Sequence, residues 1–321
     1  MKTIMICDRF ALEALVELKK NKNFEVIPCD QSQVPNVQAL IIRSKFKIDR
    51  ELLEKAKNLE LIVTCTSGFD HIDLKETESR KITVMFTPEA NIISAAEHTW
   101  ALLMACTRHI VSAHKEMKAA QWKRDPFIGF ELDGRTLGIV GLGRIGQKVA
   151  GYARAFGMNV IAFDPYQPAE VFEKNQATRM SFDELLKQSD IITFHVPATF
   201  ETHHMFSRPH YDSVDEETII INTSRGSVIN EDDLAEALLE KKIRCAGLDV
   251  FNKEPLSRDS KLMKCANLIL TPHLGAFTDD AFLKASLQAV RQTQNYFENN
   301  KTENTLPLKN EWGSLSFKER T

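Results

Sequence analysis

Residues 136–157 read TLGIVGLGRIGQKVAGYARAFG, and this stretch decides the fold. An apolar strand is predicted to end at Val140, the motif Gly141-x-Gly143-x-x-Gly146 follows, and apolar residues then recur at helical spacing. In such a strand–turn–helix unit, the first glycine permits a tight turn, the second lets the backbone approach a pyrophosphate, and the third lets helix and strand pack closely. The helix N-terminus adds N–H groups and the positive end of its dipole. The stretch therefore predicts a dinucleotide-binding site.

The next predicted strand ends in Phe163-Asp164-Pro165, so that an acidic residue follows the last glycine of the motif by 18 positions (164 − 146). A carboxylate at this place accepts hydrogen bonds from the adenosine ribose hydroxyls, which are free in NAD, and repels the 2′-phosphate of NADP. Asp164 thus predicts NAD as the cofactor. The plainer alternative is a glycine-rich structural turn with a capping aspartate.

On both sides of the glycine motif, short apolar strands alternate with helical patterns, which is typical of parallel sheets covered by helices. The predicted strands span 3–7, 24–28, 39–43, 61–64, 136–140, 159–163, 191–196, 218–222, 245–250 and 268–271. The predicted helices span 12–20, 50–57, 91–118 and about 279–298, and further helices begin after Ser181 and Asn230. The segment 91–118 is apolar around much of its circumference, which indicates burial on several sides.

Length and composition narrow the class of protein. The 321 residues suggest two domains, and 43% hydrophobic with 26% charged residues is typical of a globular chain. A net charge of −3 gives no electrostatic footprint for nucleic acid or for an anionic membrane surface. No apolar run approaches the roughly 18 residues of a membrane span, and the N-terminus reads as a strand rather than a signal peptide. We expect a cytoplasmic protein.

The cysteine and histidine spacing favours neither disulfides nor a metal site. Six cysteines are scattered without a C-x-x-C pair, which fits reduced thiols in an intracellular protein. His203 and His204 are adjacent in a polar stretch that lacks cysteines or clustered carboxylates at ligand spacing. We expect a surface loop there, and no metal.

Three later strands each lead into a loop that carries an ionisable residue: Arg225, Glu254 and His273. Loops at the carboxyl ends of parallel strands converge on the ligand in a doubly wound sheet. An arginine suits bidentate capture of a carboxylate, a histidine can exchange the proton that accompanies hydride transfer, and a glutamate can hold the other imidazole nitrogen. Singly, each could be an ordinary loop residue. Together, downstream of a dinucleotide loop, they predict a dehydrogenase.

With these motifs the chain resembles the NAD-dependent D-isomer-specific 2-hydroxyacid dehydrogenases over residues 1–305. The stretches that carry the resemblance are TSGFDHID (66–73), AAEHTWALLM (95–104), TLGIVGLGRIG (136–146), NTSRGSVIN (222–230), GLDVFNKEP (247–255) and TPHLGA (271–276). The resemblance implies an α/β architecture of two doubly wound parallel-sheet domains. A Rossmann NAD-binding domain (97–276) is inserted into a flavodoxin-like catalytic domain (1–96 plus 277–321). The resemblance also implies hinge closure around the substrate and a homodimer formed through the helix near 95–118.

The resemblance further implies the roles of individual residues. Arg225, Glu254 and His273 form the catalytic trio, in which Arg225 and His273 also contact the substrate. The implied cofactor-binding residues are Gly141, Gly143, Arg144, Ile145, Gly146, Asp164, His195, Val196, Pro197, Thr223 and Asp249, with Asp249 at the nicotinamide carboxamide. The remaining implied substrate-binding residues are Arg43, Ser67, Gly68 and Asn91.

Within the family, the stretches IIRS (41–44), TPEANIISAAE (87–97) and TPHLGA (271–276) resemble the short-form D-3-phosphoglycerate dehydrogenases. This resemblance implies reduction of 3-phosphohydroxypyruvate or the reverse oxidation in serine biosynthesis. A substrate with both a carboxylate and a phosphate needs a cation beyond Arg225, and Arg43 can supply it unless it pairs with Asp70 or Asp73. TSGFDHID departs from the G-x-D-N-x-D form of that subgroup, which keeps glyoxylate or hydroxypyruvate open. A more remote alternative is an NAD(H)-sensing corepressor. Glu254 speaks against a formate dehydrogenase, which typically has glutamine there.

Overall fold

The computed structural model describes residues 1–307, and the chain divides into two compact units. The first unit combines residues 1–92 with the described residues from Ala276 onward, and the second spans Ile93–Gly275. Residues 308–321, which the resemblance assigns to the catalytic domain, lie outside the described residues.

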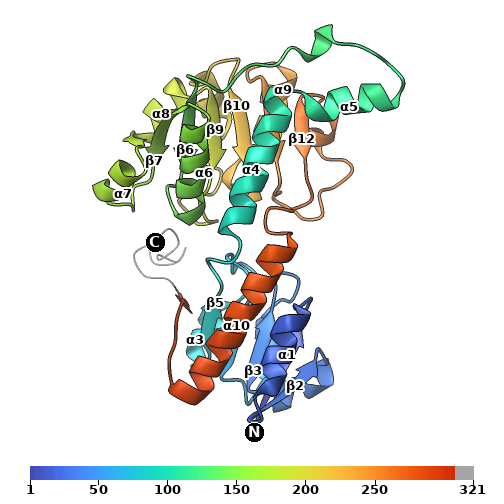
Figure 1. Ribbon diagram of the computed structural model, residues 1–321, viewed down its shortest axis with the longest axis vertical. Coiled ribbons are helices and arrows are strands. Elements are labelled where there is room, and N and C mark those ends of the chain that lie inside the picture. Colours follow the sequence, from blue (N-terminus) through green and yellow to red (C-terminus); the bar gives the residue numbers. More distant parts are fainter. Residues whose placement is uncertain (308–321) are drawn as a thin grey trace. The chain divides into compact units, whose positions relative to one another are not determined.

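The first unit is built on a six-stranded sheet in the order β13-β5-β4-β3-β1-β2. Its strands are β1 (Lys2–Cys7), β2 (Phe24–Pro28), β3 (Ala39–Ile42), β4 (Leu61–Thr64), β5 (Thr83–Phe86) and β13 (Thr305–Leu306). The first five are parallel in the 2-1-3-4-5 order of flavodoxin-like folds, and only β13 runs antiparallel, on the edge beside β5. The helices are α1 (Leu12–Lys20), α2 (Arg50–Lys55), α3 (Leu74–Ser79) and α10 (Asp279–Asn299), and α10 lies along α1 (Figure 1).

The second unit is built on a seven-stranded, wholly parallel sheet in the order β12-β11-β10-β9-β6-β7-β8. Its strands are β6 (Thr136–Val140), β7 (Asn159–Phe163), β8 (Thr178–Arg179), β9 (Ile191–Phe194), β10 (Ile219–Asn222), β11 (Cys245–Leu248) and β12 (Leu268–Leu270). Its α-helices are α4 (Ile92–Thr107), α5 (Ile110–Lys118), α6 (Arg144–Ala155), α7 (Ala169–Lys174), α8 (Phe182–Gln188) and α9 (Glu231–Leu239). The order reverses between β6 and β9, as in a Rossmann fold. The predicted fold class is confirmed.

Burial explains why these segments become strands. All four residues of β3, β4, β9, β10 and β11 are buried, so each strand is a continuous apolar run covered on both faces. The helix starts follow their capping residues. Ser181 and Glu184 form a reciprocal capping box at α8, and the Asn230 side chain accepts the N–H groups of Asp232 and Asp233 at α9.

The helical segment predicted for 91–118 is two helices rather than one. His109 adopts a left-handed backbone (φ +53°) and separates α4 from α5. Such a conformation is unfavourable for a residue with a Cβ and interrupts the helical hydrogen-bond pattern. The expected burial holds for α4, whereas α5 has no buried residue. The short strands β5, β8 and β13 and the helices α3 and α7 were not predicted.

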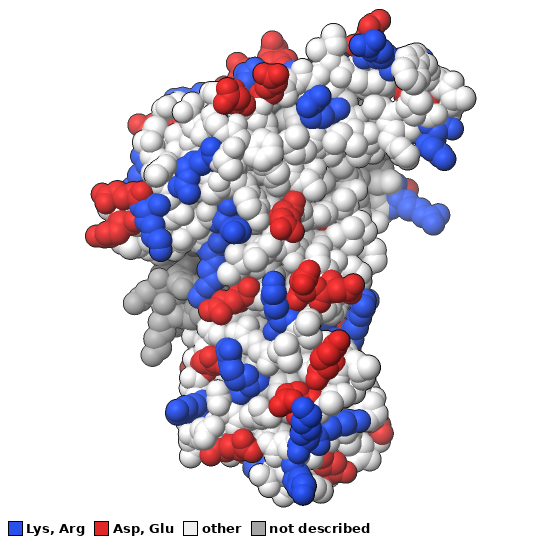
Figure 2. Space-filling model, in the orientation of Figure 1, with Lys and Arg blue, Asp and Glu red and all other residues white. Residues whose placement is uncertain are grey.

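Charged side chains of both signs are interspersed over the face shown in Figure 2. Three ion pairs of the described residues have the i, i+4 spacing on a helix surface: Arg50 with Glu54, Lys55 with Glu51, and Arg80 with Glu76. Among the described residues, none of the helices combines the length and the apolar character needed to cross a bilayer.

Candidate active site

The second unit brings the three predicted ionisable residues to one edge of its sheet. Arg225, Glu254 and His273 follow β10, β11 and β12, which are neighbours in the sheet. His273 Nδ1 lies 2.8 Å from Glu254 Oε2, and both side chains are partly open to solvent, at 47% and 39% exposure. Because Glu254 engages Nδ1, Nε2 is the nitrogen through which His273 can exchange a proton with a ligand.

The environment of Glu254 favours its ionised form. Burial raises the pKa of this carboxyl, but the hydrogen bond and the positive charge of His273, the Phe251 N–H and the charge of Arg225 together outweigh burial. The pKa of Glu254 therefore lies below its usual value. An ionised glutamate on Nδ1 holds the imidazole in one tautomer and stabilises its protonated form.

Gly226 is the reason that Arg225 can lie beside the Glu254 loop. A Cβ on Gly226 would lie 1.9 Å from the carbonyl carbon of Phe251 and 2.3 Å from the amide nitrogen of Asn252. Those atoms are backbone, so only glycine lets the loops after β10 and β11 approach this closely. The Asn222 side chain donates a hydrogen bond to the Arg225 carbonyl at 2.9 Å and secures the same turn. Sequence reasoning did not identify this requirement, although Gly226 stands within the motif.

The glycine loop fits a dinucleotide. Gly141 has φ +94°, and a Cβ there would lie 2.7 Å from the carbonyl oxygen of His195. A Cβ on Gly146 would lie 2.2 Å from the Gly141 oxygen, so strand and helix meet closely. Gly143 faces open space within 4 Å of its added Cβ. Arg144 and Ile145 begin α6, a helix whose N-terminal N–H groups suit a pyrophosphate.

Asp164 is only 2% exposed and is bonded to the same loop. Its Oδ2 accepts the Leu142 N–H at 2.8 Å, and its Oδ1 accepts the Tyr166 N–H at 3.0 Å. The carboxylate therefore supports the backbone of the glycine motif, a contact that sequence reasoning did not predict. Its role toward the ribose stays a proposal.

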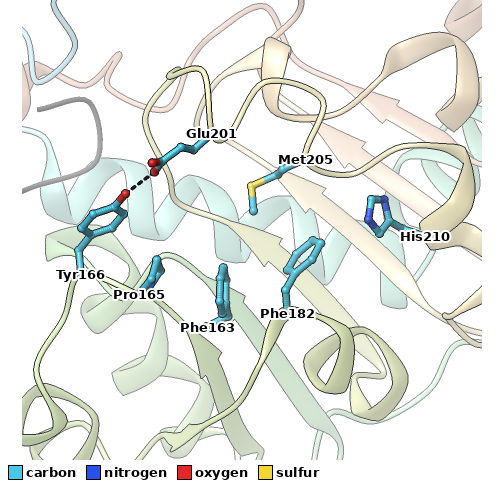
Figure 3. A pocket seen from close by; sticks show the side chains of 7 residues that line it. All are labelled: Phe163, Pro165, Tyr166, Phe182, Glu201, Met205 and His210. Carbon is cyan, nitrogen blue, oxygen red and sulfur yellow. Dashed lines mark hydrogen bonds between the residues drawn. The ribbon is translucent and has the colours of Figure 1, made fainter. Parts of the chain in front are cut away.

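A cavity of about 410 Å³ opens at the end of β7. It is lined by Phe163, Pro165, Tyr166, Phe182, Glu201, Met205 and His210, and Tyr166 donates a hydrogen bond to Glu201 at one side of it (Figure 3). The aromatic and apolar lining suits a flat heterocycle. Phe163, Pro165 and Tyr166 stand next to Asp164 in the sequence, but sequence reasoning selected Asp164 and none of the lining residues as cofactor-binding.

The other residues expected at the cofactor lie on the strand ends around this loop. His195 follows β9, and burial lowers its pKa to about 3, so its imidazole is neutral at physiological pH. Val196 is buried, and the Pro197 carbonyl accepts the Thr202 hydroxyl at 2.6 Å. Thr223 shares a hydrogen bond of 2.7 Å with Thr99 of α4. Asp249 is fully buried directly after β11.

The residues expected at the substrate in the first unit follow three neighbouring strands, β3, β4 and β5. The Ser67 hydroxyl lies 2.5 Å from Asn91 Oδ1, and the Gly68 carbonyl accepts the Thr66 hydroxyl at 2.7 Å. The Arg43 guanidinium lies 4.1 Å from the centre of the Phe282 ring, and its buried Nη1 has no hydrogen-bond partner among the described residues.

The structure does not support an ion pair between Arg43 and either aspartate considered above. No such pair with Arg43 occurs in the part of the chain that the structure describes, and Asp73 instead caps α3 by accepting the Glu76 N–H. A buried guanidinium N–H without a partner is costly, and an anionic ligand would supply the missing acceptor.

The fold and the glycine loop define a dinucleotide-binding α/β protein, and residues 100–275 match the NAD-binding domain of the D-isomer specific 2-hydroxyacid dehydrogenases. The chain belongs to this family. NAD is the cofactor that this domain binds.

Among curated relatives, the D-3-phosphoglycerate dehydrogenase of Archaeoglobus fulgidus is 37% identical over 88% of this chain and 55% of the relative. The chain spans about half the length of the phosphoglycerate dehydrogenases that it matches. The hydroxypyruvate reductase of Thermotoga maritima is 38% identical over 81% of this chain and 84% of the relative. The solved D-lactate dehydrogenase of Aquifex aeolicus, complexed with NAD and lactic acid, is 29% identical over 92% of this chain and 96% of its own, with a TM-score of 0.82.

Proposed function

We propose that the protein is an NAD-dependent D-2-hydroxyacid dehydrogenase that interconverts a 2-hydroxyacid and its 2-ketoacid. The observation that carries this proposal is the 2.8 Å contact of His273 Nδ1, in the loop after β12, with Glu254, in the loop after β11, beside the loop after β10 that carries Arg225. A proton donor, its anionic partner and a carboxylate-binding cation are the groups that ketoacid reduction requires of the protein.

Each residue has a distinct task in this reaction. When bound, the nicotinamide supplies or accepts the hydride at C2 of the substrate. His273 donates a proton from Nε2 to the carbonyl oxygen during reduction and takes it back during oxidation. Glu254 keeps Nδ1 protonated and stabilises the imidazolium. Arg225 binds the substrate carboxylate through its forked N–H groups.

We also assign groups of the protein to the adenosine end of the cofactor. In this proposal the cavity beside Tyr166 takes the adenine ring, Asp164 faces the ribose, and the first turn of α6 faces the pyrophosphate. A carboxylate at the ribose opposes the 2′-phosphate of NADP, so we expect NADH to be used more efficiently than NADPH. Equal kcat/KM values for the two cofactors would exclude this role of Asp164.

For the substrate we propose 3-phosphohydroxypyruvate, formed in the reverse direction from D-3-phosphoglycerate. The support comes from the phosphoglycerate dehydrogenases at 37% and 40% identity and from Arg43, whose buried Nη1 lacks a partner among the described residues. Hydroxypyruvate is the second candidate. It is favoured by the Thermotoga maritima reductase, because the chain covers 84% of that relative.

A substrate panel with Arg43 variants distinguishes the two candidates. The purified protein is assayed with NADH and 3-phosphohydroxypyruvate, hydroxypyruvate, glyoxylate or pyruvate. We expect the phosphorylated substrate to have the highest kcat/KM, and Arg43→Ala to lower that value by about 10- to 100-fold while affecting hydroxypyruvate less, as expected for loss of a charge-assisted contact. Arg50→Ala, at an exposed surface arginine of the same unit, is the matched control. An equal loss for both substrates would favour hydroxypyruvate.

We also propose that the protein forms a homodimer through the region of α4 and α5. Ile110, Val111 and Met117 of α5 are about half exposed, and Trp122 and Ile128 beyond it are more exposed still. A helix with no buried residue and several exposed apolar side chains needs a partner surface, and a second copy supplies one symmetrically. Trp122→Glu should shift the species seen by light scattering from dimer to monomer.

The cellular location proposed is the cytoplasm. The six cysteines form no disulfide, and five of them are buried. Free thiols in such number suit a reducing compartment.

A further inference from the structure

The loop that carries His273 is held in an uncommon backbone conformation. His273 has φ +55°, in the left-handed region that residues with a Cβ rarely occupy. Its N–H donates to the carbonyl oxygens of Asp249 at 2.9 Å and of Thr271 at 3.0 Å. A conformation of this kind persists only when surrounding contacts determine it. Those contacts therefore decide where the imidazole stands.

The buried carboxylate of Asp249 accepts most of the hydrogen bonds that hold the residues on either side of His273. The Asp249 side chain is completely buried, and it accepts hydrogen bonds from residues on both sides of His273. Before the histidine, the Thr271 hydroxyl donates to Oδ1 at 2.6 Å. After it, the Leu274 N–H donates to Oδ1 and the Gly275 N–H to Oδ2, both at 2.8 Å.

A fourth partner comes from a different element. His98 of α4 places Nε2 at 3.1 Å from Asp249 Oδ1 and at 3.0 Å from the Thr271 hydroxyl. Because Thr271 gives its single hydroxyl proton to Asp249, its oxygen is an acceptor toward His98. An ionised Asp249 is likewise an acceptor only. His98 Nε2 must therefore carry a hydrogen, which it shares between both oxygens.

The charge of Asp249 requires this support. Burial raises the pKa of the carboxyl, but the hydrogen bonds from His98, Thr271 and Leu274 outweigh burial, so that the pKa lies below its usual value. A fully buried carboxylate is stable only when it is paired and hydrogen-bonded. Of the four groups that donate to Asp249, only the His98 imidazole can carry a positive charge.

We propose that His98 is a positioning residue that keeps Asp249 ionised and oriented, so that Asp249 holds residues 271–275 and thereby sets the place of His273. This inference rests on the proposed function, since it assigns a role toward the proton donor of that reaction. His98 itself does not touch Nε2 of His273 in this scheme. Its loss should misplace the imidazole without removing any group that contacts the substrate.

Two substitutions at one position test this role. His98→Leu removes the donor at similar volume, whereas His98→Gln keeps an amide N–H near the place of Nε2. We expect His98→Leu to lower kcat by about 10- to 100-fold, the size of effect that a displacement of about 1 Å produces, with KM and the NADH Kd changed by less than about threefold. His98→Gln should recover most of the loss. Glu97→Gln, at an exposed neighbour in α4, is the control.

A measurement independent of turnover accompanies the kinetics. Hydrogen–deuterium exchange of the peptide that contains residues 271–275 should speed up by about tenfold in His98→Leu, because the Leu274 and Gly275 amides lose a well-held acceptor, and should return toward the wild-type rate in His98→Gln. Unchanged exchange and unchanged kcat in His98→Leu would overturn the inference. So would a loss that glutamine does not restore.

The two proposals fail in different ways. A wild-type protein that reduces no ketoacid contradicts the proposed function, and the exchange measurement alone then decides whether His98 holds the loop. A fully active wild type with an equally active His98→Leu variant leaves the proposed function standing and removes the role of His98.

Discussion

The candidate side chains of the two units stand at equivalent places in their sheets, but they differ in the hydrogen-bond partners that the protein gives them. In each unit, three neighbouring parallel strands deliver the residues from their carboxyl ends: β3, β4 and β5 in the first, and β10, β11 and β12 in the second. In the second unit the side chains find their partners inside the protein, as His273 does in Glu254. In the first unit Ser67 and Asn91 bond to each other, but Arg43 keeps a buried Nη1 without a partner among the described residues.

This difference separates two tasks. In the proposed reaction, proton transfer needs a donor whose direction is set before the ligand arrives, and we assign this task to His273 of the second unit, which Glu254 holds by a hydrogen bond. Recognition of an anion needs donors whose hydrogen bonds the ligand completes, and we assign this task to Arg43. Substitutions in the second unit should therefore lower kcat or stability, and substitutions in the first should raise KM.

The largest effect is expected for His273→Ala. Removing the proton donor should lower kcat for ketoacid reduction by about 10²- to 10⁴-fold, the range typical of general acid–base catalysis, while NADH affinity measured by fluorescence stays nearly the same. His203→Ala, at an exposed histidine of the same unit, is the control and should be fully active. A His273→Ala variant with wild-type kcat would remove the catalytic role of the second unit and with it the contrast between the units.

Gly226→Ala tests whether the second unit depends on the contact between its loops. The added Cβ would meet the backbone of Phe251 at 1.9 Å, so the loops must separate. We expect a loss of about 1–3 kcal/mol in unfolding free energy, as for other overpacked sites, together with a lower kcat because Arg225 moves away from Glu254.

Gly151→Ala is the matched control for that experiment. It lies inside α6, and its added Cβ would meet only the Arg154 guanidinium, at 3.9 Å. This variant should be stabilised by about 0.5–1 kcal/mol, because alanine favours the helix. Denaturant titrations that show the same change for both variants would contradict the proposed loop contact.

Glu254→Gln should change the pH dependence of the reaction by an intermediate amount. Because the pKa of Glu254 lies below its usual value, its charge is present throughout the neutral range and is lost only as the pH falls through that lowered pKa. In Glu254→Gln the anionic partner of His273 Nδ1 is absent at every pH, so the fall in rate that the wild type should show as the pH drops through the lowered pKa of Glu254 should be missing from the pH–rate profile of the variant. A profile that stays in place would make Glu254 a structural residue.

Much of the fold could be predicted because strands that are buried on both faces of a parallel sheet appear in the sequence as continuous runs of apolar residues. Phe24–Pro28, Leu61–Thr64 and Thr136–Val140 have the bounds that the pattern predicted. The pattern cannot show what depends on distant residues. The two-residue strand β13 exists only because β5 offers an edge, and the break at His109 is a left-handed turn at a residue that gives no sequence signal for one.

At the candidate site, the sequence selected three residues that the structure brings to one edge of the second sheet, and their roles stay predictions. The sequence indicates Arg225, Glu254 and His273, because each of these residues follows a predicted strand and has a side chain that can bind an anion or exchange a proton. The supporting groups give no such signal. His98 stands in an apolar helix, and its partner Asp249 lies 151 residues away, so only the folded chain brings the two together. Gly226 is needed for a contact between two loops, which no local pattern contains.

The smallest effect is expected at Phe282, and it tests the first unit alone. The ring lies beneath two cations, with the Arg43 and Arg9 guanidinium carbons at 4.1 and 4.6 Å from its centre. Phe282→Leu keeps the volume apolar but removes the π face, which is worth about 0.5–1 kcal/mol to a stacked guanidinium. The KM for 3-phosphohydroxypyruvate should rise by about two- to fivefold with kcat unchanged. Phe297→Leu makes the same change on the same helix, beneath Lys2 instead, and should leave KM as it is. A fall in kcat at constant KM would show that Phe282 acts on the reaction rather than on binding, and the division of tasks between the units would no longer hold.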